Sequence, residues 1–237
     1  SPFSISISAL HMVVPELDDG GRDVQMTEAE WRAWYDEAFP SLVAALMDSG
    51  ACWTRILIDW DVIQHDPPPA SYNWYPYHDV KLALVAESGL HMIAVVDDPP
   101  DWVGGPYVGP VAVEHLDDLA RFLTDLVNRY KGPPYNIHHW ELFNEADWAS
   151  SDGMWGWGVR GTQYAQMLAV ANAAIKAADP GATVLMGGIA YDWFTEYGGP
   201  FHRYFSDAVM AADGDQHIDA LNFHYFPDFA PEWERWV

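Results

Sequence analysis

Short apolar segments alternate along this chain with longer segments in which apolar residues recur every three or four positions. The longer segments predict helices, the first from near residue 27 to just before residue 50, the others at residues 77–88, 113–130, 162–178 and 201–212. The short segments predict six strands, at residues 5–12, 53–60, 91–96, 137–144, 183–186 and 218–226. This order predicts one domain, residues 1–237, built on a parallel sheet with helices outside it.

Polar and aromatic residues gather where the predicted strands end. They are His11, Asp59 with Trp60, Asp97 with Asp98, Asn144 with Glu145, Gly187 with Gly188, and His224 with Tyr225. A dinucleotide-binding sheet would have a glycine-rich turn after its first strand, but residues 11–15 (HMVVP) contain no glycine. In a barrel the carboxyl ends of the strands converge on one face. We therefore expect an α/β fold of the (β/α)8 TIM-barrel type, present as an incomplete barrel of about six βα units.

The chain is strongly acidic, which limits its partners. Its 237 residues include 35 Asp and Glu against 11 Lys and Arg, giving a net charge of −24. Such a charge repels phosphate backbones and anionic lipids, and the sequence has no run of eighteen apolar residues. We therefore expect neither nucleic acid nor a membrane as a partner. The only cysteine, Cys52, excludes an intrachain disulfide, and the start at Ser1 slightly favours an extracellular location.

The pair Asn144-Glu145, at the end of the fourth predicted strand, is the leading candidate for chemistry. A carboxyl group can protonate the leaving oxygen of a glycosidic bond, and an adjacent amide can hold a sugar hydroxyl beside it. A surface glutamate after an ordinary strand would look the same, so the pair alone decides little. Trp148, Trp155 and Trp157 follow in a glycine-rich loop, where aromatic rings can stack on sugars. Together these residues indicate a carbohydrate substrate.

Several of these positions resemble motifs of a known group of enzymes. Trp140 followed by Asn144-Glu145 resembles the acid/base signature of clan A glycoside hydrolases, which are retaining (β/α)8-barrel enzymes. Four other positions are similar to that clan and occur in the same order: Arg55, Pro100-Asp101-Trp102, Gly187-Gly188 and Asn222-Phe223-His224-Tyr225. The last two resemble the family that includes β-xylosidases and α-iduronidases.

The resemblance implies a role for each matched residue. Glu145 would act as general acid and then general base, and Asn144 would bond the 2-hydroxyl of the sugar beside the cleaved bond. His224 would line the same subsite, and Arg55 would set the charge of the nucleophile. Arg55 could equally pair with one of the many carboxylates, and His224 could be a buried core histidine. The other substrate-binding candidates are Tyr225, Asp98, Trp102 and Trp148.

The sequence also departs from the clan. The clan usually places a tyrosine two residues after the sixth-strand histidine; that position is Phe226, and Tyr225 faces the other side of the strand. The nucleophile of the clan ends a seventh strand, so we expect it beyond residue 237. Glu141 does not replace it, because four strand residues separate it from Glu145 by about 13 Å, too far for a retaining pair. Two later glutamates are expected on the surface: Glu232 and Glu234.

Two other interpretations remain open. A non-catalytic carbohydrate-binding or scaffold fragment would explain the missing nucleophile directly. A metal-dependent barrel hydrolase would draw on His11, His91, His138, His139 and His224, but the usual His-x-His pair is absent from the first strand. We expect no metal and no cofactor. Because an incomplete barrel exposes its edge strands, we also expect self-association or pairing with the remaining barrel segment.

Overall fold

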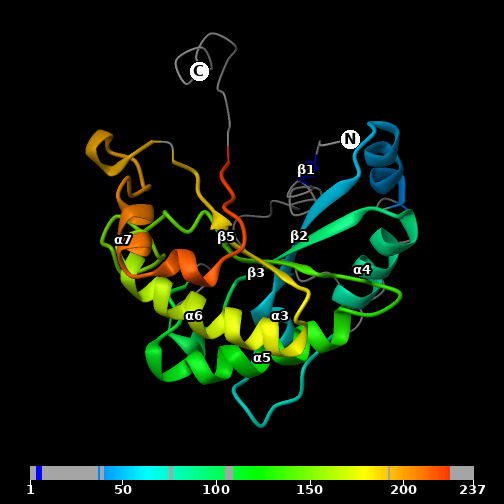
Figure 1. The fold of residues 1–237 in the computed structure, drawn as a ribbon, viewed down its shortest axis with the longest axis horizontal. Helices are drawn as coiled ribbons and strands as arrows, with labels where there is room; N and C mark the ends of the chain where they lie inside the picture. The colour runs from blue at the N-terminus through cyan, green and yellow to red at the C-terminus, as the bar shows by residue number, and fades with distance from the viewer. Residues whose placement is uncertain are drawn as a thin grey trace, which may run out of the picture.

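A five-stranded parallel sheet lies at the centre of the protein (Figure 1). The computed structural model describes residues 4–6, 37, 40–74, 77–104, 109–191 and 193–224. The strands lie in chain order and each is parallel to the next: β1 (Ser4–Ser6), β2 (Trp53–Asp59), β3 (His91–Asp97), β4 (His139–Asn144) and β5 (Thr183–Gly188). Parallel neighbours in chain order need helical crossovers, so the sheet confirms the predicted strand–helix alternation.

Helices connect the strands, and the two longest, α5 and α6, pack side by side along one face of the sheet (Figure 1). The α-helices are α3 (Trp60–Ile63), α4 (Tyr77–Ser88), α5 (Leu116–Tyr130), α6 (Gly161–Ala178) and α7 (Phe205–Ala211), and residues 40–48 are also helical. Short 3-10 turns occupy Asp101–Val103, Val113–His115, Thr195–Tyr197 and Gly214–His217. In the described ranges, none of the helices combines the length and apolar character needed to cross a membrane.

Several element boundaries differ from the prediction, and two of the larger differences have local reasons. β2 ends before Trp60, because the side chain of Asp59 accepts the N–H of Val62 at 2.9 Å and so caps α3. The helix expected from residue 113 begins with a 3-10 turn before α5. The helix expected from residue 201 begins at Phe205, because Phe201 is bridged to Trp148. Residues 7–36, 38 and 39, which hold most of the first expected strand and helix, lie outside the described residues.

The prediction of a continuous sixth strand is wrong for the described residues 218–224. Residues 218–224 run beside β5, but they form only two isolated parallel bridges, Ala220 to Leu185 and Phe223 to Ile189. The side chain of Asp219 explains part of the interruption, because its carboxylate accepts the N–H of Val184 at 2.8 Å, where a backbone carbonyl would otherwise accept. The described part of this segment therefore follows β5 without forming a regular ladder.

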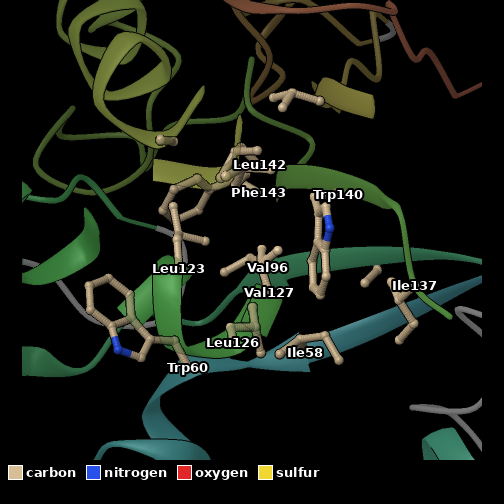
Figure 2. Close-up of a cluster of buried hydrophobic side chains, with 14 of the residues drawn as sticks. Ile58, Trp60, Val96, Leu123, Leu126, Val127, Ile137, Trp140, Leu142 and Phe143 are labelled. Atoms are coloured by element: carbon tan, nitrogen blue, oxygen red, sulfur yellow. The ribbon is translucent and has the colours of Figure 1, made fainter. Parts of the chain in front are cut away.

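The core lies between the sheet and α5 (Figure 2). β2 alternates along its length, with Ile56 and Ile58 buried toward the helices and Arg55 on the opposite face. On α5 the apolar residues recur at helical spacing, and six of them are fully buried: Leu119, Phe122, Leu123, Leu126, Val127 and Tyr130. Each such side chain contributes about 1.5–3 kcal/mol by leaving water. This core fixes β2, β3 and β4 in register and aligns their carboxyl ends.

Tyr164 of α6 joins the ends of two strands. Its buried hydroxyl donates to the carbonyl of Leu142 in β4 at 2.6 Å and accepts the N–H of Gly187 in β5 at 2.9 Å. Gly187 has no room for a side chain, since an added Cβ would lie 2.4 Å from the Leu142 carbonyl oxygen. The hydroxyl therefore occupies a gap between β4 and β5 that only a glycine leaves open.

Replacing Tyr164 by Phe should lower the free energy of unfolding by about 1–3 kcal/mol, because it leaves a buried carbonyl and a buried N–H without their partner. Urea denaturation followed by tryptophan fluorescence measures the change. Tyr204→Phe is the matched control, since Tyr204 is exposed and the same atom is removed. If Tyr164→Phe changed the free energy of unfolding no more than Tyr204→Phe does, a structural role for the Tyr164 hydroxyl would be contradicted.

Candidate active site

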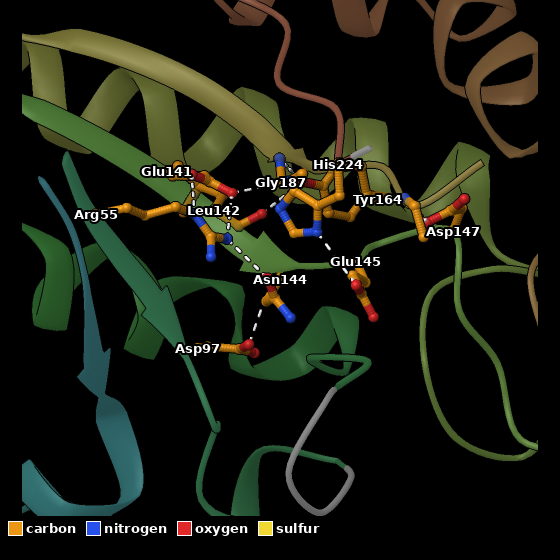
Figure 3. Close-up of polar contacts among 12 residues, drawn as sticks. Arg55, Asp97, Glu141, Leu142, Asn144, Glu145, Asp147, Tyr164, Gly187 and His224 are labelled. Atoms are coloured by element: carbon orange, nitrogen blue, oxygen red, sulfur yellow. Dashed lines mark hydrogen bonds and ion pairs between the residues drawn. The ribbon is translucent and has the colours of Figure 1, made fainter. Parts of the chain in front are cut away.

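The carboxyl end of β4 departs from regular strand geometry. Phe143 and Glu145 have positive φ angles of 67° and 46°, on either side of Asn144. Left-handed backbone of this kind costs about 1–3 kcal/mol per residue and persists only where neighbouring contacts hold it. Residues three apart on a regular strand face opposite sides, yet Glu141 and Asn144 both contact Arg55 (Figure 3). The distortion therefore turns Asn144 to the face that carries Glu141.

Arg55 of β2 forms a fork on Glu141. Its Nε donates to Oε2 at 2.9 Å and its Nη2 donates to Oε1 at 2.7 Å. Nη2 also donates to the side-chain oxygen of Asn144 at 2.8 Å. The Glu141 side chain is fully buried, whereas that of Arg55 is 11% exposed. Arg55 thus pairs with a structural carboxylate, as one of the two sequence interpretations allowed, and it also contacts the predicted substrate-binding amide.

His224 lies beside the predicted acid. Its Nδ1 is 3.2 Å from Oε1 of Glu145, and the pair is partly buried. The imidazole rests on Gly188 of β5, where an added Cβ would lie 2.2 Å from Nε2 of His224. The backbone N–H of His224 donates to the carbonyl of Ile189 at 2.7 Å, which fixes the segment against β5. The structure therefore brings together four of the predicted site residues: Arg55, Asn144, Glu145 and His224.

Asp97 lies at the end of β3, next to Asn144. Its Oδ2 accepts the backbone N–H of Asn144 at 3.1 Å, and only 7% of the residue is exposed. Burial raises the pKa of this carboxyl well above its ordinary value, and the neighbouring charge of Asp98 adds to the effect. Its other oxygen has no hydrogen-bond partner among the described residues. Asp97 is therefore a buried carboxyl group that supports the backbone of Asn144.

Asp98 belongs to a second acidic group at the ends of β2 and β3. Burial, together with the nearby charges of Asp59 and Asp61, raises its pKa to about 7. Burial also raises the pKa of Asp59 to about 6. Asp98 has a φ angle of 48°, and its carbonyl accepts the N–H of Asp61 at 2.8 Å. The predicted substrate-binding carboxylate thus faces the β2 side of the site and interacts there with other acids.

Replacing Asp98 by Asn should raise the free energy of unfolding at pH 8 by on the order of 2–4 kcal/mol, and change it little at pH 4. The pKa of Asp98 is raised from 3.8 to about 7 on folding, so the protonated form is stabilising below pH 4. That contribution is lost as the pH rises toward 7, because the buried carboxyl must ionise. Asn avoids the charge and tolerates the left-handed backbone.

Denaturation at pH 4, 6 and 8 measures this pH dependence for the wild-type chain and the Asp98→Asn variant. Asp101→Asn serves as the control, because Asp101 is exposed on the same loop. The wild-type chain should lose stability relative to Asp98→Asn between pH 4 and pH 8. Parallel stability curves for the two proteins would show that Asp98 carries no raised pKa in the folded state.

Asp147 ties together the loops that follow β4 and β5. Its buried carboxylate accepts the N–H groups of Ala190 and Tyr191 at 2.9 and 2.8 Å, and its carbonyl accepts the N–H of His202 at 2.8 Å. Burial raises the pKa of Asp147. Sequence reasoning missed this residue, although an aspartate two positions after Glu145 in an otherwise apolar run was a signal that it needed buried donors.

The loop tryptophans have different environments. Trp157 is 1% exposed and lies edge-on between Phe143 and Tyr164, so its prediction as a sugar platform is wrong. Trp148 is partly exposed and bridges to Phe201. A groove of about 630 Å³ lies between the two loops, lined by residues that include Ala149, Asp152, Trp193, Thr195, Pro200 and His202. Trp193 is 61% exposed, and sequence reasoning had not singled it out.

The remaining predicted residues lie elsewhere or outside the described chain. Trp102 packs edge-on against Trp60 and His115, on the α3 side of the sheet. His91 and His139 flank Trp53 at the amino ends of the strands, away from Glu145, and His138 pairs with Asp179. Four residues lie outside the described residues: His11, Tyr225, Glu232 and Glu234.

No family model matches the chain, and no curated protein sequence matches it. Its fold is similar to solved structures. A family 39 glycoside hydrolase from the gut symbiont Bacteroides cellulosilyticus WH2 has a TM-score of 0.58 and 20% identity, over 80% of this chain and 36% of that one. A β-galactosidase from the psychrophilic Marinomonas ef1 has a TM-score of 0.55 and 12% identity, over 87% and 40% of the two chains.

An endo-1,4-β-mannanase from Eisenia fetida has a TM-score of 0.53 and 16% identity, over 83% of this chain and 64% of that one. The chain therefore spans between about a third and two thirds of the length of these three proteins. Together with the parallel sheet and its outer helices, the likeness confirms the predicted fold class, an α/β fold of the (β/α)8 TIM-barrel type in an incomplete form.

Proposed function

We propose that this chain carries the acid/base part of a glycoside hydrolase that cleaves O-glycosidic bonds with retention of configuration. The observation that carries the proposal is the arrangement of Glu145, Asn144, Arg55 and His224 at the carboxyl end of the sheet. Active sites of (β/α) barrels are built at this end of the strands. The likeness to solved glycosidases supports the same class of substrate, a carbohydrate.

In this proposal Glu145 protonates the leaving oxygen and later removes a proton from water. Its contact with His224 orients the carboxyl group, while the left-handed backbone at Glu145 directs the side chain out of the strand. Asn144 binds the 2-hydroxyl of the sugar next to the bond being cut. A hydrogen bond at that hydroxyl strengthens as the transition state forms, so the amide would act on the rate more than on binding.

Retention needs a second carboxylate about 5.5 Å from the first. Glu141 is not available, because both of its oxygens are occupied by Arg55 and one also accepts the N–H of Gly188 at 2.8 Å. Asp97 is buried and its Oδ2 accepts the N–H of Asn144, so it is poorly placed to act as a nucleophile. We therefore expect the nucleophile beyond residue 237, and the resemblance to β-xylosidases and α-iduronidases makes pentosides and uronides the first substrates to test.

The test is a hydrolysis screen on a panel of aryl glycosides, combined with sugar titrations followed by NMR. The chain as printed should hydrolyse none of them at an appreciable rate but bind a sugar weakly, with the binding reduced in Glu145→Ala. If the reading frame continues past Val237, the longer product should hydrolyse at least one member of the panel.

Two outcomes would count against the proposal in different ways. Turnover by the 237-residue chain that is lost in Glu145→Ala would place the nucleophile within residues 1–237, with Asp97, Asp98 and Glu232 to be replaced first. If the chain binds no sugar and no longer product hydrolyses a glycoside, the glycosidase proposal is contradicted and the scaffold interpretation is favoured.

A further inference from the structure

Glu141 is the most buried charged residue of the site, and the proposed chemistry does not use it. Its side chain is fully buried and receives three hydrogen bonds, two from Arg55 and one from the N–H of Gly188. Hydrogen bonds to an ionised group are roughly twice as strong as neutral ones. Removing an ion pair from water costs more free energy than burying two apolar side chains of similar volume. We therefore considered which neighbouring groups this ion pair holds in place.

One arm of the network leads from Glu141 to Asn144. The Nη2 group of Arg55 has two hydrogens, and it donates both to Oε1 of Glu141 and to Oδ1 of Asn144. Arg55 is only a donor, so the amide oxygen of Asn144 must face it. The amide nitrogen of Asn144 then points away from Arg55. The position of Arg55 therefore fixes which end of the Asn144 amide is presented to a ligand.

The other arm leads from Glu141 to Glu145. Oε1 of Glu141 accepts the N–H of Gly188, and the imidazole of His224 rests on the bare Cα of that glycine. The same imidazole contacts Oε1 of Glu145 at 3.2 Å. One buried carboxylate thus lies at the meeting point of both contact paths, one to the amide and one to the acid (Figure 3).

We propose that Glu141 is a positioning residue, which holds Arg55 against Asn144 and Gly188 beneath His224 and so sets the orientation of both functional side chains. The inference rests on the proposed function, because Asn144 and Glu145 are the groups being oriented. It makes Glu141 responsible for how strongly the site recognises the 2-hydroxyl of its sugar, although Glu141 itself touches no ligand.

The first test follows the Asn144 side chain by NMR in the ¹⁵N-labelled chain. Glu141→Gln keeps the volume of the side chain but removes one acceptor, and Arg55 can remain hydrated because it is 11% exposed. We expect the Nδ2 signals of Asn144 and the N–H signal of Gly188 to shift in Glu141→Gln and not in the control Glu87→Gln, which changes an exposed helix residue. Unshifted Asn144 signals in folded Glu141→Gln would overturn the proposal.

Arg55→Lys is the second variant, in case Glu141→Gln does not fold. A lysine keeps a positive charge beside Glu141, but its single ammonium group cannot reproduce the planar fork that reaches Glu141 and Asn144 together. We expect the Asn144 signals to shift in this variant while the dispersed spectrum of the folded chain is retained. An Asn144 environment identical to that of the wild-type chain would overturn the proposal as well.

The second test uses a form that hydrolyses aryl glycosides. It compares kcat/KM for matched 2-hydroxy and 2-deoxy substrates, so that intrinsic reactivity cancels between variants. Glu141→Gln should lower the 2-hydroxy to 2-deoxy ratio by about tenfold or more, toward the ratio of Asn144→Ala, and the two changes should not add. A purely structural defect would lower kcat/KM equally for both substrates, and that result would overturn the inference. If no form hydrolyses any glycoside, the proposed function fails, while the Asn144 signals still decide the role of Glu141.

Discussion

Glu145→Gln, in a form of the protein that hydrolyses glycosides, should lower kcat by about 10²–10⁴-fold on substrates with poor leaving groups. Activated aryl glycosides should be affected far less in their first step, because a stable phenolate needs no proton to leave. The reason is the role proposed for Glu145, which lies at the strand end in contact with His224: it would protonate the leaving oxygen.

The measurement is a series of glycosides whose leaving groups span a wide range of pKa values. A plot of log kcat/KM against leaving-group pKa should be steeper for Glu145→Gln than for the wild type. Glu87→Gln serves as the control, since it makes the same change on the exposed side of α4. Equal losses across the series would remove the acid role from Glu145, whatever the size of the loss.

Arg55→Met should lower the free energy of unfolding by about 3–5 kcal/mol, because it leaves a fully buried carboxylate without its partner. Arg121→Met is the control: Arg121 pairs with Asp118 on the surface, where such pairs contribute at most about 1 kcal/mol. Chemical denaturation of the 237-residue chain measures both. A loss as small as that of the surface control would show that Glu141 is neutralised or hydrated in the folded protein.

A double variant separates the buried charge from the lost packing. Adding Glu141→Gln to Arg55→Met should recover part of the stability, because glutamine is neutral and can still accept the N–H of Gly188. If the double variant were less stable than Arg55→Met alone, the cost of Arg55→Met would come from lost side-chain packing.

The fold was predictable because it depends on local pattern. The buried residues of α5 recur at helical spacing, and β3 and β4 are short, nearly continuous buried runs, as expected of strands covered on both faces. The parallel order follows from the alternation of such strands with helices. The contact between Arg55 and Asn144 did not follow from strand position, because Arg55 lies in the first half of β2, level with His139, and its long side chain reaches Asn144 from there. The segment after β5 was less predictable, because the side chain of Asp219 replaces a ladder acceptor, a contact that no periodicity reports.

The role of Glu141 was missed for a physical reason. It was considered only as a catalytic partner of Glu145 along an ideal strand, and the left-handed backbone at Phe143 has no signature in the sequence. A charged residue in the apolar run of residues 140–143 was nevertheless a signal, as was Arg55 within β2. A glutamate and an arginine facing the same side of one sheet need each other when both are buried.

The left-handed backbone at Glu145 has a consequence for engineering. A glycine or asparagine adopts φ near 46° more easily than glutamate does, so Glu145→Gly and Glu145→Asn should relieve local strain. Directed evolution for thermal tolerance alone would therefore favour variants that lose the proposed acid, so libraries built on this protein need a separate selection for function at every round. At residue 145, the substitutions expected to raise stability are therefore those that remove the proposed acid.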